Sequence, residues 1–178
     1  MMKDMPLSKV YQFIEAGPVT LLVTKMDDAK PNVMAMTWHV VMDFDPPLIG
    51  CVVGAGNYSF DALCKTGQCV IAIPPASMAK TVTAIGNCTG ADTDKFGTYD
   101  ITPLPALNVS PPLLQEAIVN LECRVRDSKM VKEYNFFVLE CVKAWENPSL
   151  QNAPTLHHHG YGEFAVDGER IKMKSHMR

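Results

Sequence analysis

The sequence predicts a mainly β domain that forms a closed barrel with short helical insertions. Short runs with strand-like composition or alternation recur along the chain, and only two or three short segments have helical spacing. This succession favours a barrel over a doubly wound sheet, because that sheet places a helix after each strand. The signatures GxGxxG, GxxxxGK(S/T) and HExxH, which would indicate other sites, do not occur.

The length and charge fit one ordinary globular domain covering residues 1–178. A chain of 178 residues can bury one sizeable core and is short for two. The net charge of −3, with no basic run, argues against a nucleic-acid or anionic-membrane surface. No stretch approaches the roughly 20 apolar residues of a membrane span. We therefore expect no nucleic-acid partner and no membrane association.

The cysteine pattern indicates free thiols rather than a disulfide framework. None of the six cysteines belongs to a CxxC pair, and four of them lie in apolar runs, where Cys acts as a small hydrophobe. The opening segment MMKDMPLSKV contains no apolar stretch of signal-peptide length. We therefore expect a reduced, cytoplasmic protein.

The first elements predicted along the chain are a short helix and a hairpin. Residues 7–16 have helical spacing, which Gly17 and Pro18 would end. Residues 19–25 and 32–41 then predict two strands joined by a turn at a pair of aspartates.

The middle of the chain alternates between buried strands and short helices. Residues 48–53, LIGCVV, predict a strand that is buried on both faces, and residues 69–73 predict another. Residues 57–65 and 76–85 predict short helices, and 95–100 a loop or a helical turn.

Two longer strands are predicted in the last third. They cover residues 117–127 and 134–147 and are joined by a polar hairpin. In the first of them Glu122 and Arg124 alternate with Leu121 and Cys123, as in a strand with one wet face.

Six segments occur together in an order that is specific as a set. They are NVMAMTWHVVMDFDPPLIGCVV, NYSFDAL, TGQCVIAIP, IGNCTGADTDKF, PPLLQEAIVNLECRV and TLHHHGYGEFAVDG, and they span residues 32–168. On these motifs the sequence resembles the flavin reductase-like, FMN-binding split-barrel family, most closely its flavoredoxin-like branch. The resemblance implies a six-stranded antiparallel split β-barrel, a homodimer, and non-covalent flavin mononucleotide (FMN) near the dimer interface.

The segment MAMTWH is the first candidate for flavin contact. A strand end presents backbone N–H and C=O groups in succession, and the isoalloxazine edge carries matching acceptors and donors. Thr37 adds a hydroxyl for the ribityl chain or phosphate, and Trp38 could stack on the ring. The alternative is an amphipathic strand with a core tryptophan. The candidate residues are Met34, Ala35, Met36, Thr37, Trp38 and His39.

The junction GAGNYS is the second candidate. It follows a buried strand and opens a short helix, so free backbone N–H groups and the positive end of the helix dipole favour an anion there. We expect it to hold the FMN phosphate, with ordinary helix capping by Asn57 and Ser59 as the alternative. The candidate residues are Val53, Gly54, Asn57, Tyr58 and Ser59.

Three further residues complete the predicted flavin site. Lys80 and Thr81 open a helix, and Lys80 could neutralise the phosphate or simply be solvated. The resemblance places the lysine of the DKF piece, Lys95, near the flavin N1–C2=O edge, where its charge would stabilise the reduced ring. The alternative is a surface salt bridge of Lys95 with Asp92 or Asp94.

The triplet His157, His158 and His159 has no assigned role at this point. Adjacent side chains of a strand point to opposite faces, so the three are poorly placed to bind one metal ion. One of them could face a nicotinamide or another substrate, or all could be packing residues. We expect no metal site.

The resemblance implies two functions. The first is an NAD(P)H-dependent flavin or ferric-complex reductase, in which hydride passes from NADH or NADPH to flavin N5 and electrons leave to a small-molecule or protein acceptor. No general acid or base is required, which fits the lack of a carboxylate dyad or catalytic triad. The second is a flavoredoxin-type electron carrier that a partner protein reduces. A barrel with a purely structural role is a third interpretation.

Overall fold

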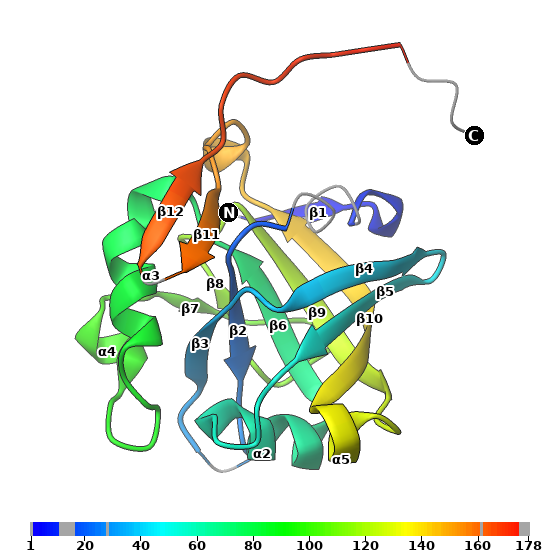
Figure 1. Ribbon diagram of the computed structural model, residues 1–178, viewed down its shortest axis with the longest axis vertical. Coiled ribbons are helices and arrows are strands. Elements are labelled where there is room, and N and C mark those ends of the chain that lie inside the picture. Colours follow the sequence, from blue (N-terminus) through cyan, green and yellow to red (C-terminus); the bar gives the residue numbers. More distant parts are fainter. Residues whose placement is uncertain (1, 11–16, 28, 161, 175–178) are drawn as a thin grey trace.

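The centre of the computed structural model is one curled antiparallel sheet of eight strands (Figure 1). The structure describes residues 2–10, 17–27, 29–160 and 162–174. The strand order is β3-β2-β6-β9-β10-β5-β4, and β1 pairs with β10. The strands are β1 (Lys3–Met5), β2 (Thr20–Thr24), β3 (Asn32–Met36), β4 (His39–Phe44), β5 (Pro47–Val52), β6 (Gln68–Ile73), β9 (Val119–Asp127) and β10 (Phe136–Glu146).

Short elements surround this sheet. Two small hairpins are formed by β7 (Pro103–Leu104) with β8 (Leu113–Leu114) and by β11 (Leu156–Gly160) with β12 (Glu163–Val166). The helices are α2 (Tyr58–Thr66), α3 (Ala79–Gly86), α4 (Lys95–Thr98) and α5 (Val131–Tyr134), with 3-10 turns η1 (Leu7–Lys9), η2 (Ala76–Met78) and η3 (Pro148–Leu150). The prediction of a mainly β domain interrupted by short helices is confirmed.

The two edge strands of the sheet are neighbours in sequence, and this explains its curl. β3 ends at Met36 and β4 begins at His39, yet β3 pairs with β2 and β4 pairs with β5 at opposite ends of the strand order. Only Thr37 and Trp38 separate them, so both edges must lie close together. The single strand predicted over 32–41 is therefore wrong, because the chain changes its pairing partner at these two residues.

Two apolar clusters lie on the two faces of the sheet around β2. Leu22 and Ile71 belong to the cluster inside the barrel. Leu21 and Val23 point the other way and pack with Val82 of α3 and other side chains of the helical layer. The helices α3 and α4 thus cover the outer face of β2 and β3 (Figure 1). Two cavities lie between β3 and this helical layer.

Other sequence expectations differ from the structure in detail. The helix expected over 7–16 begins as the 3-10 turn η1, and its part from residue 11 lies outside the described residues. The polar hairpin between β9 and β10 contains the helical turn α5. The sheet has eight strands rather than six, since residues 32–44 form two and β1 adds another. All six cysteines are free. Within the described residues, no helix is long and apolar enough to cross a membrane.

Candidate functional site

Three adjoining cavities run along β3 between the sheet and the helical layer. The Lys95 cavity, of about 260 Å³, is lined by β3, the start of α2, the end of α3 and residues 86–90. The His158 cavity, of about 230 Å³, shares Ala35 with it, and the Lys30 cavity, of about 270 Å³, shares Asn32. Because neighbouring cavities share lining residues, we call the three together the trench along β3.

The start of α2 forms one wall of the Lys95 cavity. Asn57, Tyr58 and Ser59 all line it. Asn57 is the N-cap residue but makes no capping hydrogen bond, because its Nδ2 donates to the Gly54 carbonyl at 3.2 Å. The helix N-terminus beside the cavity therefore lacks a side-chain cap and favours an anion there.

Lys95 is the most deeply buried cation near this cavity. The residue is only 3% exposed, and its Nζ donates to the Ile85 carbonyl in the last turn of α3 at 3.0 Å. Burial lowers the pKa of Lys95. The alternative of a surface salt bridge is wrong, because Lys95 is buried against the Ile85 carbonyl, and Asp94 pairs instead with Lys30 at 2.6 Å. A lysine has three N–H donors, so Lys95 retains donors for a ligand.

A buried polar network that the sequence did not reveal lies beside Lys95. Asn32, at the start of β3, is 6% exposed and donates from Nδ2 to Ser59 Oγ at 2.9 Å. Thr24 Oγ1 donates to the same oxygen at 3.2 Å. The Asn32 Oδ1 atom is buried and has no partner among the described residues. The sequence indicates only that Asn32 begins a strand. Its position between two cavities identifies it as a candidate site residue.

The loop after α3 closes the cavity with small and polar residues. Cys88 Sγ lies 3.3 Å from the Tyr99 hydroxyl and 3.4 Å from the Ala84 carbonyl. A Cβ at Gly90 would overlap the side chains of Asn32 and Tyr58, so only glycine fits there. The sequence motif IGNCTGADTDKF indicated a functional loop. It did not single out the cavity-lining residues Asn87, Cys88, Thr89 and Gly90.

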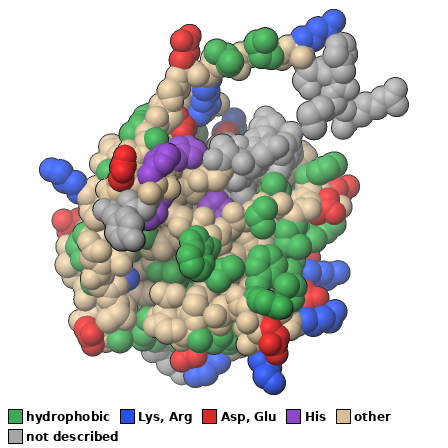
Figure 2. Space-filling model, in the orientation of Figure 1, with side chains coloured by type: hydrophobic (Ala, Val, Ile, Leu, Met, Phe, Trp, Pro, Cys, Tyr) green, Lys and Arg blue, Asp and Glu red, His purple; other side chains and the backbone are tan. Residues whose placement is uncertain are grey.

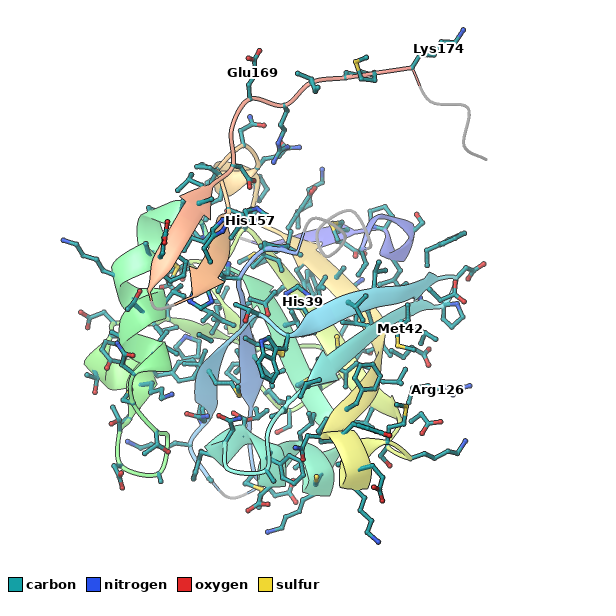
Figure 3. The ribbon with its side chains drawn as sticks, in the orientation of Figure 1. His39, Met42, Arg126, His157, Glu169 and Lys174 are labelled. Carbon is teal, nitrogen blue, oxygen red and sulfur yellow. The ribbon has the colours of Figure 1, made fainter. Side chains whose placement is uncertain are left out.

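The His158 cavity is formed mainly by β3, α3 and the β11–β12 hairpin. Thr37 lines it, and so do His158 and Phe164, whose ring centroids lie 5.2 Å apart. His157, in strand β11 (Figure 3), does not line it, and its Nε2 lies 2.6 Å from Asp167 Oδ1. Burial alone would raise the pKa of Asp167, but hydrogen bonds from Thr155 and His157 outweigh it and the pKa is lowered.

Trp38 and His39 lie at the junction of β3 and β4. The Trp38 side chain is 71% exposed, so in a single chain it is not a core tryptophan. His39 is the first residue of β4 (Figure 3), and its Nε2 lies 2.8 Å from the Pro18 carbonyl, while its Nδ1 is buried without a partner among the described residues. Burial lowers the pKa of His39.

The remaining predicted residues lie outside the three cavities. Met36 and Val53 are buried in the barrel core, and Gly54 accepts hydrogen bonds from Asn57. Lys80 and Thr81 are in the first turn of α3, whereas the Lys95 cavity adjoins its last turn, roughly 9 Å away along the helix axis. Of the predicted residues, the structure brings Met34, Ala35, Asn57, Tyr58, Ser59 and Lys95 together at the Lys95 cavity, with Thr37 at the adjoining one.

The chemistry of the trench fits FMN, the cofactor that the resemblance implies. The uncapped start of α2 and the buried Lys95 ammonium favour a phosphate. The open Asn32 oxygen is a place for a polar ligand group. The edge of β3 and the aromatic rings of the His158 cavity suit a flat heterocycle.

Comparisons with known proteins show the family of this chain. The model of the Flavin reductase like domain matches residues 14–164. The uncharacterized protein YddH of Escherichia coli (strain K12) is 28% identical over 174 residues, which is 90% of this chain and 92% of that protein.

Solved structures show the same fold. The FMN-binding domain of a flavin reductases-like enzyme from Shewanella baltica OS155 has a TM-score of 0.90 at 21% identity, covering 98% of each chain. The flavoredoxin of Desulfovibrio vulgaris (Miyazaki F) has a TM-score of 0.80 at 22% identity, covering 88% of this chain and 90% of that one. These likenesses confirm the split-barrel fold. With the family model matched over most of its length, the chain belongs to the flavin reductase-like domain family.

Proposed function

We propose that this protein is an FMN-dependent reductase that takes electrons from NADH or NADPH. The observation that carries the proposal is the buried Lys95 ammonium, which shares one cavity with the uncapped N-terminus of α2 beside the edge of β3. Two features that favour negative charge therefore converge where the family is expected to bind flavin. The FMN-binding description of the Shewanella baltica structure supports the same cofactor.

The order of the cavities suggests how FMN would lie. The phosphate would face the start of α2 in the Lys95 cavity, where Asn57 and the helix dipole favour an anion. The ring would follow β3 past Ala35 toward Thr37, since both line the His158 cavity. The Lys80 ammonium would then be too far from the phosphate to neutralise it, and Lys95 would be the nearer cation.

The chain's own groups would bind, orient and tune the cofactor. When bound, FMN supplies a ring that exchanges hydride or single electrons. Lys95 would stabilise the negative charge of the bound phosphate, because the ammonium is buried and weakly screened. His158, Thr37 and Phe164 would form the place where a nicotinamide or an electron acceptor meets the ring.

Turnover of nicotinamide separates the reductase from a flavoredoxin-type carrier. FMN-loaded protein is mixed with NADH or NADPH and an electron acceptor, and the loss of nicotinamide absorbance is followed. Free FMN at the same concentration is the control. Consumption well above that control supports the reductase. No consumption, with FMN that a chemical reductant still reduces reversibly, would overturn the nicotinamide step in favour of the carrier.

We also propose a homodimer formed through the outer side of β4. Trp38, Val40, Met42 and Phe44 are large apolar residues that are at least half exposed there, and together we call them the β4 stripe. Figure 2 shows hydrophobic side chains gathered over this side of the molecule. Apolar side chains that gather on one face of a strand in this way mark an interface, whereas single exposed apolar residues do not. A cytoplasmic location suits a chain with six free thiols.

A further inference from the structure

Asn32 occupies the junction between two cavities and is only partly hydrogen-bonded. It lines both the Lys95 cavity and the Lys30 cavity, although its side chain is almost wholly buried. Its Nδ2 donates to Ser59 Oγ, and its Oδ1 has no partner among the described residues. A buried amide oxygen without a donor is unfavourable. The unpaired Asn32 oxygen therefore points to a ligand or to a second orientation of the amide.

The hydroxyl of Ser59 makes a second orientation possible. In the structure this oxygen accepts from Asn32 Nδ2 at 2.9 Å and from Thr24 Oγ1 at 3.2 Å. Both bonds use the hydroxyl as the acceptor, which leaves its own proton to donate. If the Asn32 amide turns over, Oδ1 accepts that proton and Nδ2 faces the cavities. The oxygen and the NH₂ group are nearly equal in size, so the turn needs no repacking.

The surroundings of the turned amide favour an anion. The start of α2 and the Lys95 ammonium belong to the same cavity as Asn32. The acidic side chain of Asp94, in the neighbouring cavity, is held by Lys30 at 2.6 Å. Gly90 brings its backbone against the Asn32 amide where a Cβ would overlap, which fixes the side chain at the junction. An outward N–H there would complete a set of donors around one anionic group.

We propose that Asn32 recognises the phosphate of FMN by turning its amide. In the bound state Nδ2 donates to a phosphate oxygen, and Oδ1 accepts the Ser59 hydroxyl proton. Every buried polar atom of the Asn32–Ser59 pair then has a partner. The inference rests on the proposed binding of FMN in the Lys95 cavity. It makes Asn32 a specificity residue that separates FMN from riboflavin, which has no phosphate.

Paired titrations of the apo-protein with FMN and riboflavin test this role. In Asn32→Asp, a carboxylate would face the phosphate dianion, so we expect FMN binding to weaken at least about tenfold and riboflavin binding less than about twofold. Thr24→Val is the matched control. Thr24 is paired with Asn32 in the β2–β3 register and bonds the same Ser59 oxygen, but it lines none of the three cavities. It should leave the ratio of the two affinities unchanged.

A spectroscopic readout on the wild-type protein does not depend on how the variant folds. The side-chain amide signal of Asn32 in an NMR spectrum of isotope-labelled wild-type protein, assigned through its proximity to the Ser59 and Thr24 side chains, should move on adding FMN and stay in place on adding riboflavin. Equal movement with both flavins, or an equal loss of both affinities in Asn32→Asp, would overturn the inference and leave FMN binding intact. A wild-type protein that binds neither flavin would overturn the proposed function as well.

Discussion

The buried polar side chains of this molecule fall into two regions that differ in how fully they are satisfied. In the barrel wall, Glu122 accepts from the Leu107 and Asn108 backbone N–H groups at 3.0 and 2.5 Å and from the Trp145 indole at 2.7 Å. Asn120 bonds both the N–H and the carbonyl of Leu114. These groups are fully buried and bonded within the chain.

The trench along β3 also buries polar groups but leaves some of them partly open. Asn32 has an oxygen without a partner, and Lys95 uses one of its three donors on a carbonyl. Polar groups that the chain itself satisfies fix the fold, because leaving them unpaired is costly. Groups that remain open after folding mark the place where a ligand completes the hydrogen bonding. The difference therefore separates structural residues from binding residues.

The largest expected effect concerns the barrel wall. Glu122→Gln replaces an acceptor of three hydrogen bonds with a group that has two donors of its own, so at least one buried donor loses its partner. The free energy of unfolding should fall by about 2–4 kcal/mol, measured by denaturant titration of the apo-protein. Asn32→Ala in the trench should cost less than about 1.5 kcal/mol, because this amide is already half unpaired. Equal losses at both positions would remove the distinction.

The β4 stripe is a second region that we expect to be completed by a partner, because its apolar side chains are exposed in the single chain. Met42→Lys places a charge in an apolar interface and should weaken the dimer by about 2–3 kcal/mol, seen as monomers in light scattering at low concentration. Met130→Lys is the control, since Met130 is 48% exposed and Met42 50%, but Met130 lies before α5. The control should keep a mass of about twice 19.6 kDa. Dissociation by both variants, or by neither, would contradict an interface at β4.

A smaller effect is expected at Lys95. Lys95→Met keeps the length of the buried chain and removes its charge, so FMN binding should weaken about tenfold, or ~1.4 kcal/mol. The midpoint potential of the bound flavin should fall only slightly, because in the proposed orientation Lys95 faces the phosphate and the ring lies in the adjoining cavity. A redox titration of the loaded variant measures this. Unchanged affinity together with an unchanged potential would return Lys95 to a capping role at α3.

The smallest expected effect is a pH dependence at His39. Burial lowers the pKa of His39 in the folded chain from its ordinary value of 6.5. The unfolded chain therefore binds a proton more readily, and the free energy of unfolding should decrease as the pH falls through 6.5 toward the lower folded pKa. The contribution is fully present above pH 6.5. Unfolding curves of His39→Gln should vary less over this interval, and a slope equal to that of the wild type would assign it to another group.

Most of the sheet could be predicted from the sequence, since apolar runs and turn residues encode strands locally. The break at Thr37 and Trp38 could not, because both halves of residues 32–44 have strand composition and only pairing with different strands separates them. Partner choice is a non-local property that composition does not record.

The site was predicted in part for a similar reason. The junction GAGNYS has a local signature for an anion site, and it does border the Lys95 cavity. The burial of Lys95 was not predictable, because neighbouring aspartates in the sequence indicate an exposed charged loop. Its burial depends on contact with the end of α3, where Ile85 accepts its hydrogen bond. The unpaired state of the Asn32 oxygen depends on Ser59 and Gly90, which are far from Asn32 in sequence.

Titration of the apo-protein with FMN, followed by flavin fluorescence, tests the central claim that the trench along β3 is a cofactor site. We predict saturable quenching at micromolar FMN or below, with one FMN per chain and distinctly weaker binding of riboflavin. Asn32 and Lys95 would then have their missing partner. A flat titration at micromolar FMN, on folded protein, would contradict the account.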